Sequence, residues 1–265
     1  MTVWALMLEY DGAPYVGWQR QTNGLSVQEV LETAAARLSG GAPVSTVVAG
    51  RTDAGVHAEA QVVQLILPSV LNADRLREAL NYHLKPHPVA VLQAAAAPDG
   101  WNARFSAVGR AYRYRILNRR ARPALDAGRV WHVPAPLDAG AMHAAAQILL
   151  GRHDFTSFRA AGCQANSPLR TLDRLDVNRY SEAIEVVAEA RSFLHHQVRN
   201  MVGTLKLVGE GNWRPADVGV ALAARDRSAA GPTAPADGLF LTGVKYSPDP
   251  FAATEELAKM ARGAR

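Results

Sequence analysis

"VVAGRTDAGVHAEAQVVQL", residues 47–65, places an aspartate on a short turn between two apolar segments. β-branched runs on either side, at 43–50 and 60–67, are typical of two strands joined by a loop. An ordinary tight turn needs only an Asp and a Gly, so the arginine two positions before Asp53 has no role in it. We therefore expect a strand pair joined by a loop that carries Asp53, and a plain turn leaves the purpose of Arg51 beside it open.

The elements around this turn follow the order of a split βαβ unit. We expect a strand at 3–9, a helix capped by Ser26 and ending near Leu38, strands at 43–50 and 60–67, a helix at 72–84 and a strand at 89–96. The order strand, helix, strand, strand, helix, strand is that of a ferredoxin-like fold. The first half of the chain therefore predicts one such unit.

The second half repeats this order of elements without repeating the residues. We expect strands at 109–117, 171–179, 183–191 and 238–246, and helices at 138–150, 194–208 and 215–224. The predicted fold class is α+β, with two ferredoxin-like halves (1–106 and 107–265). Together they would form an extended, mostly antiparallel sheet with helices on one side and a central cleft. Residues 228–238 are expected to be a surface loop, and 250–263 an exposed helix.

Several classes of protein are excluded by what the sequence lacks. No apolar window approaches 18 residues and the first residues do not resemble a signal peptide, so we expect a cytoplasmic protein that does not bind membranes. The single Cys163 excludes a disulfide framework and a multi-cysteine zinc site. His195 and His196 are adjacent, and on a helix they would point about 100° apart, too far to chelate one ion. HExxH, P-loop and GxGxxG motifs are absent, so neither a metal nor a cofactor is expected.

The basic residues are concentrated in one segment. The formal net charge is +5 and the pI about 9.6, and 25 of the 29 basic residues are Arg. Residues 104–129 contain eight Arg and one acid, Asp126, which predicts a phosphate-contacting surface. An alternative explanation of the general preference for Arg over Lys is the base composition of the genome.

Two further segments could contact a substrate or simply pack. In "GRAYRYRIL" (109–117), Tyr112 and Tyr114 share one strand face, suited either to stacking on a base or to ordinary half-buried packing. The opposite face carries two arginines, suited to phosphate or to acids. In the helix that begins near residue 194, Arg199 lies at the margin of an apolar stripe and needs a partner, which a carboxylate across the cleft would supply.

Six motifs carry a resemblance to a known family. They lie in order between residues 10 and 246, over about nine-tenths of the chain, and read "YDGAPYVGWQRQ", "GRTDAGVHA", "WNARFSAVGRAYRYRI", "GRHDFTSFRA", "FLHHQVRNMVG" and "DGLFLTGVKY". Together they closely resemble the tRNA pseudouridine synthase A family. That family consists of isomerases that convert uridines 38–40 of the tRNA anticodon stem-loop to pseudouridine, as homodimers without metal or cofactor.

The resemblance implies a role for each matching residue. Asp53 is implied to be the catalytic aspartate, and Tyr112 to contact the target base. Arg199 is implied to pair with the Asp53 carboxylate, and Arg51 to help displace the target base, although a turn-capping Arg51 is the alternative. Arg104, in the Arg-rich segment, is a further candidate for substrate binding.

The alternative from another class is a catalytically silent tRNA-binding module on the same scaffold. Basic composition fits both hypotheses equally well. Asp53 discriminates between them, because binding alone does not require a carboxylate beside a base and would favour its removal. The first bond that Asp53 makes, to C1′ or to the uracil, or its action as a base, stays open at this stage.

Overall fold

The computed structural model describes residues 1–67 and 71–252, and it divides into two compact units. The first unit is Met1–Val108 with the chain from Leu241 onward, and the second is Gly109–Phe240. Strands that are mostly antiparallel, with packed helices, make up both units, which confirms the predicted α+β class. The described residues end at 252, so residues 253–263 of the helix predicted at 250–263 lie outside them. No helix in the described ranges is long and apolar enough to cross a membrane.

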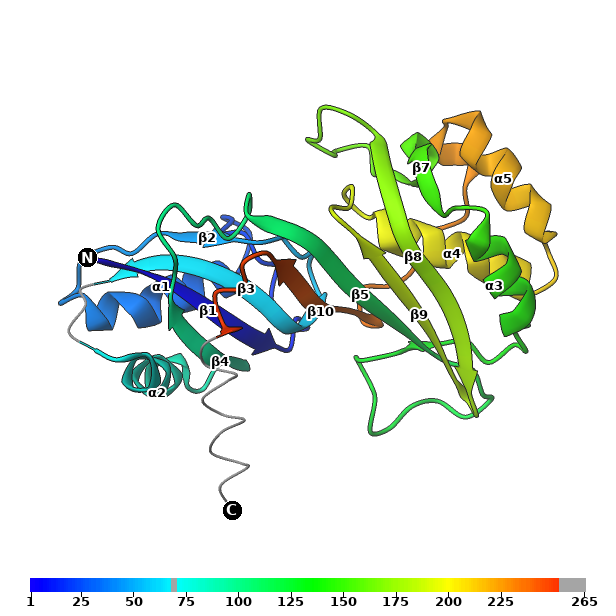
Figure 1. The fold of residues 1–265 in the computed structure, drawn as a ribbon. Helices are drawn as coiled ribbons and strands as arrows, with labels where there is room; N and C mark the ends of the chain where they lie inside the picture. The colour runs from blue at the N-terminus through cyan, green and yellow to red at the C-terminus, as the bar shows by residue number, and fades with distance from the viewer. Residues whose placement is uncertain (68–70, 253–265) are drawn as a thin grey trace, which may run out of the picture. The chain divides into compact units, whose positions relative to one another are not determined.

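The first unit has the predicted order of elements (Figure 1). Its elements are β1 (Thr2–Tyr10), α1 (Val27–Leu38), β2 (Thr46–Val48), β3 (His57–Leu67), α2 (Ala73–Leu84) and β4 (Val89–Ala96). The strands lie in the order β4, β1, β3, with β2 antiparallel to one part of β3 and β10 (Leu239–Tyr246) also beside β3. This is the ferredoxin-like arrangement, extended by one strand from the C-terminal part of the chain.

Local sequence explains why the helices of this unit start where they do. The Ser26 side chain accepts a hydrogen bond from the backbone N–H of Glu29, and Asn72 caps α2 in the same way. The buried faces of α1 and α2 pack against each other beneath the sheet. On the other face of the sheet, Trp101, Tyr246 and other apolar side chains form a second buried cluster.

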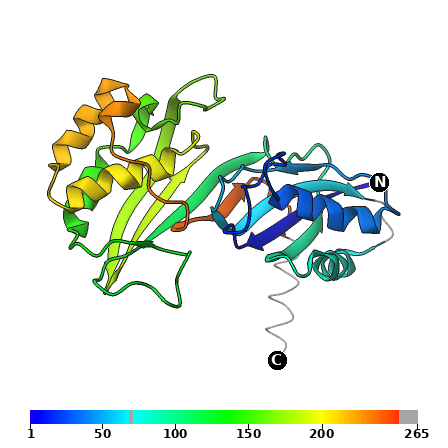
Figure 2. The same ribbon diagram turned by 180° about the vertical axis from the view of Figure 1, so that it is seen from behind.

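The second unit carries the remaining elements. They are β5 (Ala107–Leu117), β6 (Trp131–His132), α3 (Ala139–Gln147), β7 (Gly151–Asp154), β8 (Leu169–Tyr180), β9 (Ala183–Ala190), α4 (Gln197–Gly209) and α5 (Pro215–Ala224). The strands lie in the order β5, β9, β8, β7, all antiparallel, and β6 runs parallel to β5. Figure 2 shows α3 and α4 on the same face of these strands. The sequence did not predict β6 and β7, because two to four residues are too few to show a period.

The core of this unit contains the residues that the strand alternation and the helical spacing placed on one face. Every second residue of β9 is buried, and the apolar stripe predicted on α4 is buried as well. Helices α3 and α4 approach closely at Gly209, where an added Cβ would lie 2.7 Å from the Sδ atom of Met142. The helix pair therefore requires a small residue at this crossing.

The prediction of a surface loop at 228–238 is wrong in part. Gly231, Ala234 and Gly238 are buried, although Pro232, Thr233 and Asp237 between them are exposed. An added Cβ on Gly203 of α4 would collide with the carbonyl oxygen of Pro232, so the loop backbone lies directly on the helix. Small residues, which suggested a surface loop, allow this close packing.

Candidate active-site loop and its partners

Asp53 lies on the loop 50–56, which connects β2 to β3 and is anchored by buried polar contacts. The hydroxyl groups of Thr52 and Tyr10 lie 2.8 Å apart and are both buried. Gln61, fully buried on β3, donates from Nε2 to the carbonyl oxygen of Gly50 at 2.8 Å and, at 3.4 Å, to the Tyr10 hydroxyl. The loop is thus fixed to β1 and β3 through groups whose loss would leave buried polar atoms unpaired.

A second loop, residues 11–18, packs against the loop that carries Asp53. The backbone N–H of Trp18 donates to the carbonyl oxygen of Thr52 at 3.0 Å, and that of Gly55 donates to Tyr15 at 3.3 Å. Gly17 has φ +108°, and an added Cβ there would lie 2.8 Å from the Thr52 carbonyl oxygen. The motif "YDGAPYVGWQRQ" (10–21) therefore packs against the Asp53 loop.

His57 joins the two loops where β3 begins. Its Nδ1 lies 3.1 Å from the backbone nitrogen of Gly12 and 3.1 Å from a carboxylate oxygen of Asp11, and the side chain is only 2% exposed. One ring nitrogen either accepts the Gly12 N–H or donates a proton to Asp11. In both states His57 ties the loop at residues 11–18 to the strand after Asp53, a role that sequence reasoning did not assign to it.

Burial of Tyr10 predicts a loss of stability in alkali. Desolvation raises the pKa of Tyr10 to about 12, although its hydrogen bonds to Thr52 and Gln61 act in the opposite direction. A raised pKa in the folded state means that stability is complete below about pH 10 and is lost as the pH rises toward 12. Two pH units correspond to about 3 kcal/mol. We expect denaturant unfolding to show a fall of that order in the free energy of unfolding.

The matched variants for this prediction are Tyr10→Phe and Tyr82→Phe. Tyr10→Phe should reduce the alkaline fall in the free energy of unfolding, while the raised pKa values of Tyr15 and Tyr114 keep part of it. Tyr82→Phe, the same change at a side chain that is 73% exposed, should leave the fall as in the wild type. A wild-type free energy that stays constant from about pH 9 to 12 would contradict the buried environment of Tyr10.

The remaining site candidates of the first unit lie on two loops. Asp53 is partly exposed, and its carbonyl oxygen accepts a hydrogen bond from the backbone N–H of Val56 at 3.1 Å. Arg51 is exposed on the same loop. Arg104 is exposed elsewhere in the unit, where its guanidinium carbon lies 5.7 Å from the centre of the Phe105 ring. The structure thus brings Arg51 and Asp53 together on one rigid loop.

Tyr112 and Tyr114 lie on β5 with their rings on the buried face, as the alternation predicted. The Tyr112 ring meets Phe193 edge-on, with centroids 5.2 Å apart and planes at 90°. The Tyr114 hydroxyl donates to the carbonyl oxygen of Pro235 at 2.8 Å, and burial raises its pKa well above the usual value. Tyr114 is therefore a packed, protonated core residue, and Tyr112 is held at a fixed angle by its aromatic neighbour.

Arg199 lies in the first turn of α4, partly buried as expected from the margin of the apolar stripe. Its Nε donates to the carbonyl oxygen of Ala234 at 2.8 Å, and the Ala234 N–H donates back to the Arg199 carbonyl oxygen at 3.1 Å. These bonds fix the direction of the side chain. The ion pair of Arg199 with Asp53 stays a prediction.

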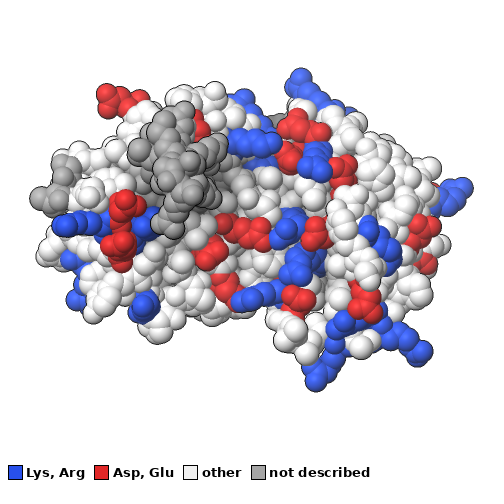
Figure 3. Space-filling model, turned by 60° about the horizontal axis from the view of Figure 1, so that its bottom comes forward, with Lys and Arg blue, Asp and Glu red and all other residues white. Residues whose placement is uncertain are grey.

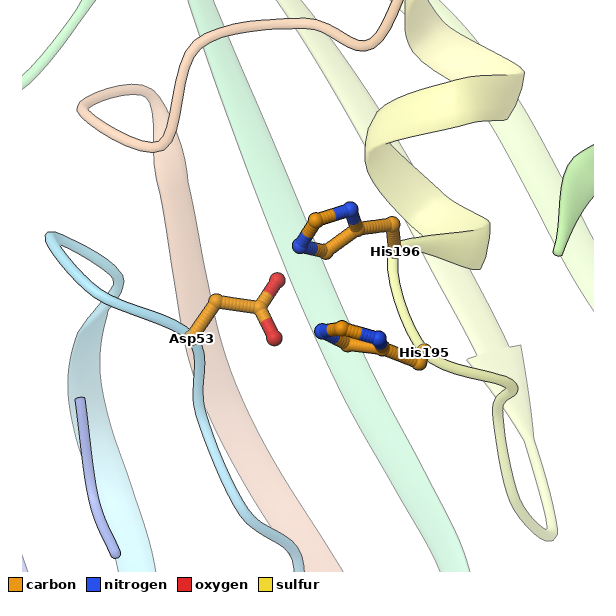
Figure 4. Close-up of side chains that lie close together, drawn as sticks. All are labelled: Asp53, His195 and His196. Atoms are coloured by element: carbon orange, nitrogen blue, oxygen red, sulfur yellow. The ribbon is translucent and has the colours of Figure 1, made fainter. Parts of the chain in front are cut away.

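The expected geometry of the histidine pair is wrong. Helix α4 begins at Gln197, so neither histidine is helical, and His196 has a left-handed backbone with φ 61°. The two imidazole rings lie together, with centroids 4.0 Å apart, instead of pointing about 100° apart. Figure 4 labels both histidines on the segment that precedes the helix, and Asp53 on the loop that precedes β3.

The Arg-rich segment 104–129 is less positive in the structure than in the sequence. Three of its arginines lie near acids: Arg113 near Glu185 at 3.9 Å, Arg115 near Asp126 at 3.4 Å and Arg119 near Glu182 at 2.9 Å. Two of these acids belong to β9 or the turn before it, distant in sequence. The face shown in Figure 3 accordingly carries acidic and basic side chains intermingled. The Arg face of β5 meets acids, one of the two partners that its pattern allowed.

Comparison with known proteins identifies the class to which this fold and loop belong. A family model described as tRNA pseudouridine synthase matches residues 6–106 and 145–247, which include Asp53 and Arg199. The matched ranges make up most of both units. The class is that of enzymes that isomerise uridine in tRNA.

Individual relatives identify the family within this class to which the chain belongs. A tRNA pseudouridine synthase A from Acidiphilium cryptum is 73% identical over 95% of this chain and 99% of its own length. Proteins of the same name from Paramagnetospirillum magneticum and Rhodospirillum centenum are each 62% identical over 93% of this chain, and over 96% and 100% of their own lengths. The chain belongs to the tRNA pseudouridine synthase A family.

Proposed function

We propose that this protein converts uridines at positions 38–40 of the tRNA anticodon stem-loop to pseudouridine, with Asp53 as the catalytic residue. The observation that carries the proposal is the anchoring of the Asp53 loop. Buried contacts from β1, β3 and the loop 11–18 hold its backbone on three sides. Such rigidity positions a reactive group before the substrate arrives, which lowers the entropic part of the barrier.

The reaction needs a carboxylate but no electron transfer. The bond between N1 and C1′ breaks, the uracil turns, and a new bond joins C5 to C1′. The hydrogen on C5 leaves as a proton and N1 gains one, so atoms and charge balance. An ionised Asp53 can add to C1′, add to the uracil ring, or take a proton, and all three require it to be deprotonated at neutral pH.

The target uridine must leave its stack before Asp53 can reach it, which costs a few kcal/mol. Arg51 is exposed and only two residues from Asp53, so its planar guanidinium is suited to fill the vacated space. Tyr112, fixed edge-on by Phe193, offers a flat ring for the extruded base. We assign base displacement to Arg51 and base stacking to Tyr112.

Arg199 is assigned to pair with the Asp53 carboxylate, so Arg199→Ala should reduce both activity and stability. Loss of the Nε bond leaves the Ala234 carbonyl oxygen without its side-chain partner, at a cost of about 1–3 kcal/mol. We expect kcat to fall because the carboxylate loses its assigned positive neighbour. The measurements are denaturant unfolding and kcat of tritium release.

Arg199→Lys is the control for that prediction. It keeps the charge, so it should recover part of kcat while stability stays low. If Arg199→Ala lowers stability but leaves kcat unchanged, Arg199 is a structural residue and its assignment to Asp53 fails.

The proposed function is tested by release of tritium from tRNA that carries 5-tritiated uridine. The wild-type protein should release tritium from unmodified tRNA, and sequencing of the product should place pseudouridine at positions 38–40. Product at other positions would overturn the proposed site of action. We further propose a homodimer that acts in the cytoplasm without cofactor, for which sedimentation of the free protein should give twice the 28.5 kDa chain mass.

A further inference from the structure

A cavity of about 210 Å³ opens in the second unit, where β7, β8 and the end of β9 meet. Figure 1 shows these three strands side by side. Six residues line the cavity: Arg152, Leu169, Arg170, Thr171, Arg191 and Ser192. Half of them are arginines, contributed by three separate segments of the chain.

Strand register explains why two of these arginines converge. Arg152 on β7 is the direct partner of Thr171 on β8, so their side chains share a face. Leu172 and Ala190 pair on the neighbouring strands and are buried, which turns Thr171 and Arg191 to the opposite, exposed face. Two guanidinium groups with a hydroxyl between them therefore share one outward surface.

Arg170 also lines the cavity, but it belongs to the other face of β8 from Thr171 because it alternates in step with the buried Leu172. One of its terminal nitrogens donates to the carbonyl oxygens of Ser167 and Leu169, at 3.0 and 2.6 Å. The donors on the outward surface are therefore those of Arg152, Thr171 and Arg191.

The acids close to the cavity are already paired with other side chains. Arg174 binds both Asp176 and Glu189, at 2.5 and 3.2 Å. Asp154, at the end of β7, accepts from Thr156 and lies 3.6 Å from Arg225. In the part of the chain that the structure describes, no carboxylate forms an ion pair with the three cavity arginines, in contrast to Arg113, Arg115 and Arg119.

We propose that this cavity binds a phosphate group of the tRNA backbone. Arg forks match phosphate oxygens geometrically, and a hydroxyl between two of them completes the set of donors. The inference rests on the proposed function, because it assumes tRNA as the substrate. It assigns the phosphate contact to Arg152 on β7 and Arg191 just after β9, instead of the arginines at 113–119 that meet acids.

The first test compares two double variants with the same change in charge. Arg152→Gln with Arg191→Gln should weaken binding of unmodified tRNA at least about tenfold and reduce the slope of log affinity against log salt by about 1–2. The single-turnover rate at saturating tRNA should stay as in the wild type. Arg214→Gln with Arg225→Gln removes two arginines that face acids in the same unit, and should change affinity by less than about twofold.

A second test needs no substitution. An arginine-selective dicarbonyl reagent, read by mass spectrometry, should modify Arg152 and Arg191 more slowly when unmodified tRNA is bound, whereas Arg214, which is 85% exposed, should react at the same rate. Inorganic phosphate replaces tRNA in a parallel arm. Protection by both ligands supports the proposal, and protection by inorganic phosphate alone overturns it in favour of a site for a free anion.

The results of these tests can contradict the cavity site without contradicting the proposed function, and the reverse. A wild-type protein that releases tritium, together with an Arg152, Arg191 double variant of unchanged affinity and salt slope, would overturn the cavity site and leave the function standing. Equal losses in both double variants would also overturn it, since total charge would then explain the effect. A wild-type protein that binds tRNA but releases no tritium would overturn the proposed function alone.

Discussion

Asp53→Asn is expected to abolish pseudouridine formation while the protein stays folded and binds tRNA. The amide has the shape of the carboxylate but carries no charge, so it neither adds to the sugar or base nor takes a proton. We expect tritium release to fall by at least about 10⁴-fold, the upper end of what one positioned acid or base contributes. The hydrogen bond from Val56 reaches the main-chain oxygen of residue 53 and survives the change. Stability should stay within about 0.5 kcal/mol of the wild type.

Asp99→Asn is the matched control for this variant. Asp99 is an exposed aspartate on another loop of the same unit, so it loses the same charge without contact with the 50–56 loop. Its tritium release and tRNA affinity should match the wild type. Turnover by Asp53→Asn above about one-hundredth of the wild-type rate would sink the catalytic assignment.

Gly12→Ala is expected to have the second-largest effect, because it acts on the support of the Asp53 loop. An added Cβ would collide with the carbonyl oxygen of Val56, the residue after the turn. The loop must then shift, and a misplacement of about 1 Å costs up to about 10²-fold in rate. We expect kcat to fall by that order and the free energy of unfolding by about 1–3 kcal/mol, with tRNA affinity nearly unchanged.

Gly243→Ala is the control for Gly12→Ala. An added Cβ on Gly243 meets no atom within 4 Å, so this variant should keep wild-type kcat. Gly17→Ala offers a second probe of the same contact, since it introduces a side chain at φ +108° against the Thr52 carbonyl oxygen. Wild-type kcat in both Gly12→Ala and Gly17→Ala would show that the anchoring of the loop does not set the rate.

The elements predicted correctly from the sequence are those that show a helical or strand period over several residues, or that begin at a capping residue. The capped helices, the alternating strands and the apolar stripe of α4 all occur where they were predicted, within a few residues at each end. It also singled out Asp53 and Arg51, whose roles stay predictions, because a turn that needs only Asp and Gly does not require the arginine. The two-residue β6 and the four-residue β7 carry no such signal and were missed.

Contacts between distant segments account for most of the remaining errors. For the arginines of β5 the sequence left phosphate and acids open, because Glu185 lies far along the chain and meets Arg113 only when β9 pairs with β5. The histidine pair was misjudged because His196 is left-handed and the helix begins only after it, at Gln197. Tyr10 and Gln61 are ordinary strand residues in sequence, and only their burial around Thr52 shows that they hold the loop.

The first unit contains a strand that is translated last. Its sheet is completed by β10, and its second apolar cluster by Tyr246 and Phe251, after the whole second unit has left the ribosome. Until then Trp101 lacks the ring that it packs against, and β3 lacks one of its neighbours. The Asp53 loop begins at the edge of this cluster, next to Ala49. A nascent or prematurely terminated chain is therefore expected to hold the Asp53 loop loosely, so that this loop becomes fixed only when synthesis is complete.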